Sequence, residues 1–219
     1  MRSFLLVLWA FGLLSCRSEK IAESAAESSL WHELMEPEIQ KSWQKVAYGK
    51  QEMVHWESDG AEKSRLSCDM GAELIGARWT GELPKVPYEL ELEARRMNGN
   101  DFFCGLTFPV RRDDELVTLV VGGWGGAVVG ISSIDGLDAA NNQTTTRHDF
   151  KQKRWYRVKI RVEEAALSAW IDDEKVLALP LMGKKLALRP GPIAQCAPLG
   201  IGAWQTGAEF RKMRWRSLK

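Results

Sequence analysis

Apolar and polar residues alternate along much of the chain after residue 43. In the segment 88–95, Leu90, Leu92 and Ala94 occupy every second position, and charged residues fill the positions between them. The segment 155–162 alternates in the same way. Successive side chains of a strand point to opposite sides, so this period of two predicts strands with one face in a core and the other in water.

Further short apolar runs are separated by turn-forming residues. Residues 98–101, Asn-Gly-Asn-Asp, make one such turn, and glycines or prolines bound several others. Hardly any stretch after residue 43 has a helical period. We therefore predict an all-β fold, a jelly-roll sandwich of two antiparallel sheets, because two stacked sheets bury many short strands of this kind. The further strands expected are 102–110, 116–121, 127–133, 167–171, 175–179, 199–204 and 209–215.

The N-terminus has the pattern of an export signal. Arg2 precedes an uninterrupted apolar run at residues 4–14. A helix of that length spans only about half of a ~30 Å hydrocarbon core, which fits a cleaved signal peptide better than a membrane-spanning helix. The run ends in Leu-Leu-Ser-Cys16, which resembles the bacterial lipobox, where cleavage before the cysteine exposes it for acylation. A plain secretory signal cleaved elsewhere is the alternative.

These features predict three parts: a signal peptide at 1–15, a lipidated tether at 16–40 that is rich in Glu, Ser, Ala and Lys, and a β-sandwich domain at 41–219. We expect an exported lipoprotein of the bacterial envelope, anchored in the membrane by acyl chains at Cys16. The site of anchoring is expected at the outer membrane or the periplasmic face. Arg17 favours the outer membrane, because in bacterial lipoproteins an Asp at that place often signals inner-membrane retention.

Charge and cysteine content narrow the choice of partners. The chain has 30 Lys and Arg against 29 Asp and Glu, so it has no surplus of positive charge to drive binding to nucleic acid, which is not an expected partner. Ten Trp residues favour a β-rich fold or flat aromatic surfaces that bind a ligand. Cys68, Cys104 and Cys196 have spacings that suit no zinc site. We expect buried thiols, with a single disulfide as the alternative.

Three segments resemble a known family. The residues 154–172 look like the laminin-G-type hairpin, in which a Trp opens a strand and its partner strand ends in an Asp turn. Together with 88–108 and with 199–215, a Gly-x-x-x-Gln segment followed by a Phe-Arg strand, they resemble the 3-keto-disaccharide hydrolase domain family of bacteria. That resemblance implies a concanavalin A-like sandwich and a glycoside hydrolase activity. The chain departs from the family at 116–146, which is short, Gly-rich and almost without Glu.

A polar loop offers the best group of ligand-binding candidates. It carries Asp135, Asp138, Asn141 and Asn142, whose carboxylate and amide groups suit sugar hydroxyls or, as an alternative, oxygen ligation of a divalent metal such as calcium. No cofactor is predicted otherwise. Trp124 lies between two glycine pairs that cannot shield it, so its indole is a candidate platform for a pyranose ring. The alternative is that the glycines permit close strand crossing and Trp124 packs inward.

Other polar residues are considered for binding or chemistry. Gln205 follows Trp204 in a segment where glycines bring the backbone close, so it is a further ligand-binding candidate. His148 is the better histidine for catalysis because Asp149 adjoins it, and Asp138 is the accompanying candidate, although a surface imidazole is the commoner outcome. The alternating Glu residues of 89–93 superficially resemble the acid strand of family-16 glycoside hydrolases. Their position before the Asn-Gly turn favours a solvated strand face instead.

The sequence thus predicts an envelope lipoprotein whose β-sandwich domain binds a glycoside and, on the family resemblance, hydrolyses it. Whether it is an enzyme stays open, because the residues alone contain no convincing catalytic pair. The alternative is a non-catalytic laminin-G-type module that binds a carbohydrate or a protein. Fold does not fix the choice between them.

Overall fold

A computed structural model of the chain describes residues 31–47, 53–58 and 64–218, and nearly all of its regular structure is strand. The strands confirm the predicted fold class. The elements, in chain order, are β1 (His32–Glu33), η1 (Pro37–Ser42), β2 (Trp43–Ala47), β3 (Val54–Glu57), β4 (Arg65–Cys68), β5 (Leu74–Trp79), β6 (Tyr88–Gly99), β7 (Cys104–Pro109), β8 (Leu116–Gly123), β9 (Val128–Ser132), β10 (Thr146–Arg147), β11 (Tyr156–Val162), β12 (Ala166–Ile171), β13 (Glu174–Pro180), η3 (Pro192–Cys196), β14 (Leu199–Trp204) and β15 (Thr206–Ser217).

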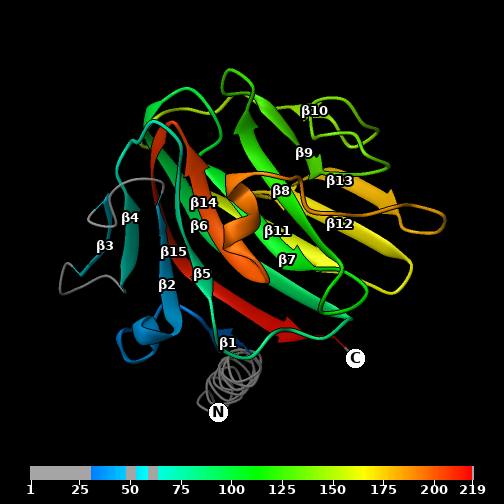
Figure 1. The fold of residues 1–219 in the computed structure, drawn as a ribbon, viewed down its shortest axis with the longest axis horizontal. Coiled ribbons are helices and arrows are strands. Elements are labelled where there is room, and N and C mark those ends of the chain that lie inside the picture. The colour runs from blue at the N-terminus through cyan, green and yellow to red at the C-terminus, as the bar shows by residue number, and fades with distance from the viewer. Residues whose placement is uncertain (1–30, 48–52, 59–63, 219) are drawn as a thin grey trace, which may run out of the picture. The chain divides into compact units, whose positions relative to one another are not determined.

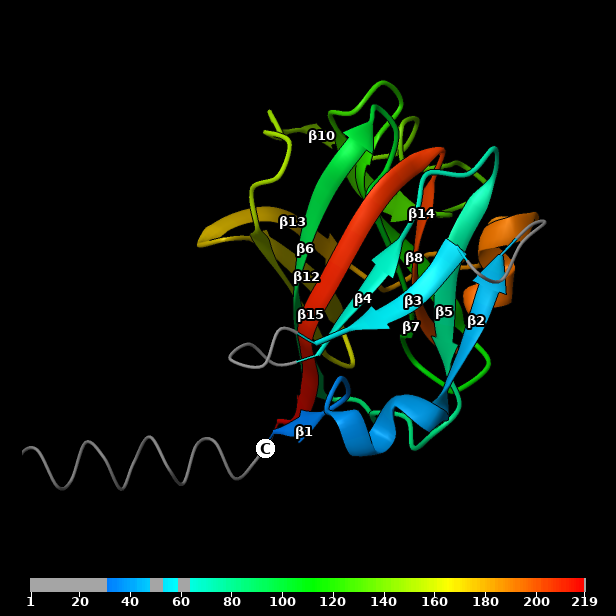
Figure 2. The ribbon, with the colours of Figure 1, turned by 90° about the vertical axis from the view of Figure 1, so that its left-hand side faces the viewer.

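Two antiparallel sheets face each other as a jelly-roll sandwich (Figure 1). The first, sheet A, runs in the order β13-β12-β11-β6-β15-β4-β3. The second, sheet B, runs in the order β10-β9-β8-β7-β14-β5-β2. In Figure 2 the strands β15 and β4 of sheet A lie to the left of β14 and β5 of sheet B, so the two sheets are seen side by side. Strands far apart in sequence are neighbours, as where β14 lies between β5 and β7.

The core lies between the sheets and follows from the period of two. Leu90 and Leu92 of β6 point inward and are at most 1% exposed. On sheet B, Leu106, Leu119 and Ile131 pair across β7, β8 and β9 and are fully buried. Burying such a side chain stabilises the fold by roughly 1.5–3 kcal/mol each, which is why the alternating segments become strands.

The outer face of sheet A carries a ladder of ion pairs. β6 contributes Glu89, Glu91 and Glu93, while the neighbouring β11 and β15 contribute basic residues at paired positions. Glu89 accepts hydrogen bonds from Arg161 at 2.6 Å and from Arg216 at 2.7 Å. The alternating Glu residues therefore hold strands together. The expectation of a solvated face is wrong for Glu89, which is 1% exposed because its arginine partners cover it.

A long connection crosses the outer face of sheet B. We call residues 181–198 the arm; it leads from β13 to β14 and contains η3, which Figure 1 shows in front of β14. Glycine makes this packing possible, because a Cβ added at Gly200 would lie 2.4 Å from the carbonyl oxygen of Cys196. The arm is also fixed by two backbone hydrogen bonds between Ser133 and Ala187. Cys196 and Leu74 form a small second core beneath it.

The three described cysteines are buried and free. Cys68, Cys104 and Cys196 form no disulfide, and burial raises the pKa of the thiols of Cys104 and Cys196 to about 12. The expectation of buried thiols is confirmed.

The packed unit begins at Glu33. Leu34 and Met35 belong to the main core with 2% and 3% exposure, and the indole N–H of Trp43 donates to the carbonyl oxygen of Leu34 at 2.6 Å. The last part of the predicted tether, 33–40, therefore packs with the sandwich. The predicted signal peptide and Cys16 lie outside the described residues. Within the described residues no helix is long and apolar enough to span a membrane.

Candidate binding site

A cavity of about 350 Å³ opens on the outer side of sheet B, where two turns, the arm and the end of β14 meet. Trp124 lines it, so we call it the Trp124 cavity. The turn between β6 and β7 and the turn between β8 and β9 form one side, and the arm forms the other. Its lining residues are Asp101, Phe102, Trp124, Arg189, Pro190, Gly191, Pro192, Ile193 and Trp204.

Trp124 occupies a tight turn that exposes its side chain. Its φ is 46°, and Gly122, Gly125 and Gly126 on either side have φ values of 80°, 83° and 100°. Glycine adopts these left-handed conformations without the penalty that a Cβ imposes, so the glycine pairs let the chain reverse within a few residues. Trp124 is 39% exposed. The indole of Trp124 therefore lies at the surface and does not pack into the core, and its use as a platform for a sugar ring stays a prediction.

Two further aromatic residues join Trp124 in the cavity. Phe102 follows the β6–β7 turn and Trp204 ends β14, and the backbone N–H of Trp204 donates to the carbonyl oxygen of Phe102 at 3.0 Å. Both side chains pack against the small core under the arm, which fixes their positions. The cavity is therefore lined by rigid aromatic surface from three separate parts of the chain.

Two charged groups of opposite sign complete the lining. The guanidinium carbon of Arg189 lies 5.7 Å from the ring centroid of Trp124, and its Nη1 lies 3.4 Å from Oδ2 of Asp138. Asp101 accepts a hydrogen bond at Oδ1 from the backbone N–H of Phe102 at 2.7 Å, while its own N–H donates to Oγ1 of Thr206. The cavity thus combines aromatic faces with both a carboxylate acceptor and guanidinium donors.

A buried arginine supports both turns from behind. Arg96, 5% exposed, donates from Nη2 to the carbonyl oxygens of Asp101, Gly122 and Gly126 at 3.2, 3.1 and 2.9 Å. Burial lowers the pKa of this guanidinium below its usual value, and the charge of Asp101 partly opposes the shift. Arg96 therefore joins the turn that carries Asp101 to the turn that carries Trp124.

The predicted polar loop mainly stabilises itself. Oδ1 of Asp138 accepts from the backbone N–H of Ala140 at 3.0 Å and from Nδ2 of Asn141 at 2.8 Å. Asn142 donates to the carbonyl oxygen of Asp138 at 2.7 Å, and Asp135 accepts from the backbone N–H of Lys185 at 3.0 Å. Asp135, Asn141 and Asn142 do not line the Trp124 cavity, and Asp138 reaches it through Arg189.

Gln205 and His148 lie away from the cavity. The amide of Gln205 donates to the carbonyl oxygen of Ala72 at 2.9 Å and so links the end of β14 to the connection between β4 and β5. The ring of His148 packs against Phe150 and Tyr156, with centroids 4.6 and 5.9 Å apart, and its Nδ1 lies 3.9 Å from Oε2 of Glu174. The structure therefore does not bring His148 together with Asp138. In the part of the chain that is described, no group of three His, Cys, Asp or Glu side chains is arranged to hold a metal ion.

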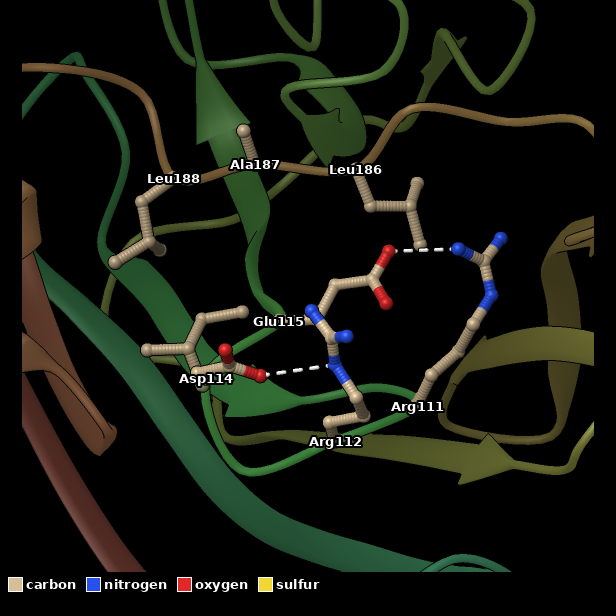
Figure 3. Close-up of a pocket in the computed structure, with 8 residues that line it drawn as sticks. Arg111, Arg112, Asp114, Glu115, Leu186, Ala187 and Leu188 are labelled. Atoms are coloured by element: carbon tan, nitrogen blue, oxygen red, sulfur yellow. Dashed lines mark hydrogen bonds and ion pairs between the residues drawn. The ribbon is translucent and has the colours of Figure 1, made fainter.

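A larger hollow of about 720 Å³ lies on the other side of the arm, beside the β7–β8 hairpin (Figure 3). Its charged groups are paired with one another: Arg111 with Glu115 at 2.6 Å and Arg112 with Asp114 at 3.0 Å. Its lining, residues 111–112, 114–116 and 186–188, contains no aromatic residue. We therefore regard the Trp124 cavity as the better binding site.

The sequence patterns did not predict that Asp101, Phe102, Arg189 and Trp204 line the cavity. They come from three segments whose meeting depends on strand order and on the path of the arm, neither of which a local pattern encodes. One signal was present, because the arm residues 189–192 read Arg-Pro-Gly-Pro, a rigid and irregular stretch typical of binding loops.

Comparison with solved structures shows the fold. The Crh5 transglycosylase in complex with NAG has a TM-score of 0.54 at 12% identity, covering 87% of this chain and 85% of that chain. The carbohydrate recognition domain of Emp46p, in its metal-free form, has a TM-score of 0.51 at 12% identity over 81% and 88%. Domain 4 of AbnA, a GH43 extracellular arabinanase from Geobacillus stearothermophilus in complex with arabinotriose, has a TM-score of 0.50 at 11% identity over 80% and 81%.

No protein-family model matches the sequence, and no curated protein matches it significantly. The likeness to the three structures is therefore one of architecture.

Proposed function

We propose that the protein binds a carbohydrate in the Trp124 cavity. The observation that carries this proposal is an exposed indole, held rigidly in a turn, beside a second indole and between a carboxylate and a guanidinium. The apolar face of a sugar ring packs against an indole, while its hydroxyl groups need both donors and acceptors at the edge. Asp101 supplies acceptors and Arg189 supplies donors in this arrangement.

The comparisons support the proposal by analogy. The Crh5 structure holds NAG, and the AbnA domain holds arabinotriose. A shared fold does not transfer a ligand at such low identity. The proposal therefore depends on the residues of the cavity, and the sugar is to be found by experiment.

Replacement of Trp124 tests the proposal. We expect glycan-array screening of the purified protein to find a ligand, and Trp124→Gly to weaken its binding at least tenfold, about 1.4 kcal/mol. Glycine suits the positive φ at this position, so the melting temperature should change little. Met182→Ala, at a side chain 90% exposed and outside the cavity, is the matched control. Unchanged affinity in Trp124→Gly would contradict the proposal, as would the absence of any glycan ligand.

We propose binding without hydrolysis. Among the described residues that line the cavity, Asp101 is the single carboxylate, whereas most glycoside hydrolases use two carboxylates on either side of the bond they cleave. The family resemblance nevertheless makes 3-keto-glycosides the substrates to try. Incubation with glycosides and 3-keto-glycosides, with and without divalent metal, should release no sugar detectable by mass spectrometry. If the protein does release sugar, and if Asp101→Asn abolishes that release, the protein is an enzyme and the proposal of binding without hydrolysis is wrong.

We also propose that the protein is an envelope lipoprotein anchored through Cys16. The support is the N-terminal sequence, a short apolar run that ends in a lipobox-like Leu-Leu-Ser-Cys. On this proposal the sandwich domain is attached to the envelope, whose glycans are then candidate ligands of the Trp124 cavity.

A further inference from the structure

We propose a second site, on the outer face of sheet A, that binds the acidic groups of a polysaccharide. It is formed by Trp170 with Lys159, Lys175 and Arg161, which we call the Trp170 cluster. The cluster lies on β11, β12 and β13, in the opposite sheet from the Trp124 cavity. It does not depend on the function proposed for that cavity.

The register of three strands brings the cluster together. Trp170 on β12 pairs with Lys159 on β11 and with Lys175 on β13, so a lysine flanks the indole on either side. The two ammonium nitrogens lie 4.5 and 5.2 Å from the ring centroid, and the guanidinium carbon of Arg161 lies 5.9 Å from it. Contact with the ring restrains both flexible lysine side chains, which reduces the entropy they lose when they bind an anion.

The cluster is unusual on this face because its two lysines form no ion pair among the described residues, although Glu91 of β6 lies opposite Lys159. Arg161 is paired with Glu89, and Arg211 and Arg214 are paired with glutamates of β6. Among the described residues, no ion pair includes Lys159 or Lys175.

The acidic residues next to the cluster in sequence are directed elsewhere. Asp173 pairs with Arg157, and the carboxylate of Glu174 lies near His148. Two ammonium groups therefore converge on one indole, and the carboxylate opposite Lys159, that of Glu91, is balanced by Arg214 at 2.6 Å rather than by the lysine. A bound anion would balance the two ammonium groups.

The two lysines could serve to bind a ligand or to protect a sheet edge from pairing with another molecule, and the position of Lys159 favours binding. β13 is an edge strand, and a lysine on an edge discourages pairing with another molecule, which alone would explain Lys175. Lys159, however, lies on β11 in the interior of the sheet, where no such protection is needed. Both lysines together are better explained by a shared anionic ligand.

The size and charge of the cluster favour an acidic polysaccharide over nucleic acid. Firm binding to a nucleic acid backbone uses many phosphate contacts, often about 6–10, from a strongly basic surface. Here the whole chain has 30 basic and 29 acidic residues, and the cluster offers two unpaired ammonium groups. Carboxylate or sulfate groups on successive sugars suit such a small set of donors, because each sugar presents one or two charges beside hydroxyl groups.

Binding of polygalacturonate and of a sulfated dextran to the purified protein tests the proposal, with neutral dextran as the uncharged reference. We expect at least one acidic polymer to bind, and the double variant Lys159→Gln and Lys175→Gln to bind it at least tenfold more weakly. The dependence of log affinity on log salt should also fall by about 1.5, since each lost lysine removes a little under one unit. The matched control is Lys45→Gln with Lys151→Gln, two exposed lysines outside the cluster.

Several outcomes would overturn the proposal. One is equal binding by the cluster and control variants; another is no binding of either acidic polymer. Tighter binding of duplex DNA, or of phosphatidylglycerol vesicles, with the same sensitivity to Lys159 and Lys175 would assign the cluster to a different partner. Trp124→Gly should leave acidic-polymer binding unchanged, so failure at one site is distinguishable from failure at the other.

Discussion

Arg96 shows how one buried charge shapes a binding surface made of two turns. A guanidinium taken out of water needs acceptors, and here three backbone carbonyl oxygens from the β6–β7 and β8–β9 turns supply them. Those carbonyls in turn depend on Arg96, because few other donors reach the inside of a tight turn. The distance between Asp101 and Trp124 is therefore set by a residue that does not line the cavity.

We predict that Arg96→Met lowers the free energy of unfolding by about 2–4 kcal/mol, because it leaves three carbonyl groups without their donor. It should also reduce glycan binding, and amide hydrogen exchange should accelerate at Gly126, which closes the β8–β9 turn with a hydrogen bond to Gly123. Urea denaturation and exchange measured by mass spectrometry check these effects. Arg112→Met, at an exposed ion pair with Asp114, should change stability by less than about 0.5 kcal/mol. An equally small effect of Arg96→Met would contradict the positioning role.

At the scale of single residues, the sequence predicted what local geometry decides. The glycine pairs around Trp124 indicated an exposed indole, because they both permit the turn and leave the ring uncovered. The Asp and Asn residues of 135–142 indicated a polar loop, but such residues bond to their own backbone as readily as to a ligand. Spacing alone does not separate these two uses, so Asn142 was a candidate for binding and is found holding its loop together.

At the scale of elements, the ladder on sheet A combines a local pattern with a long-range one. The period of two in β6 predicts that its glutamates share one face. It does not reveal that β11 and β15, which lie far away in sequence, would flank β6 with basic residues. Register and strand order determine those partners, and both are properties of the assembled sheet. Glu89, 1% exposed between Arg161 and Arg216, is the most enclosed residue of this ladder.

The ladder makes stability depend on pH in a defined direction. Burial alone would raise the pKa of Glu89, but hydrogen bonds from Arg161 and Arg216 outweigh it and lower the pKa below 4.5. A carboxylate whose pKa is lowered by folding stabilises the native state above its unfolded pKa, and that stability is lost as the pH falls through the folded value. We predict that Glu89→Gln costs about 2–4 kcal/mol at pH 7 and that the difference from the original protein shrinks below about pH 4.

Urea denaturation of both proteins at pH 7, 5 and 3 measures this difference. Glu163→Gln, at an exposed turn residue with no ion pair among the described residues, is the matched control and should leave stability nearly unchanged. A difference for Glu89→Gln that stays constant from pH 7 to pH 3 would show that the pairing adds nothing to stability.

At the scale of the whole molecule, alternation was enough to predict two stacked sheets, because many short half-apolar strands have few other ways to bury their surface. The path of the arm was not predictable in the same way. Residues 181–198 lack a periodic pattern, and their place over sheet B depends on close contacts at glycines such as Gly105 and Gly200. The Trp124 cavity exists because the arm lies there, which is why the lining residues 189–193 were not predicted.

The start of the packed unit gives a further prediction. Leu34 and Met35 are buried in the main core although they precede residue 41, where the sequence placed the beginning of the sandwich. Replacing both with Ala should lower the free energy of unfolding by at least about 4 kcal/mol, since each buried large-to-small change costs roughly 2–5 kcal/mol. Glu38→Ala with Lys41→Ala, at exposed positions of η1, should have little effect. Thermal unfolding compares the two pairs, and similar melting temperatures would place residues 34–35 in the tether instead.

The membrane attachment that we propose for Cys16 can be tested separately from the charge of sheet A. Acyl chains contribute about 0.8 kcal/mol per buried methylene, so two or more of them anchor a protein against salt, whereas electrostatic attraction of the Trp170 cluster to an anionic surface is screened by salt. We predict that the original protein stays in the membrane fraction after a high-salt wash and that Cys16→Ala is released. Ser18→Ala, two residues away, should remain bound. If Cys16→Ala resists the wash, acylation at this residue is not the anchor; if the original protein is washed off, its attachment is one of charge, and the lysines beside Trp170 become the residues to change next.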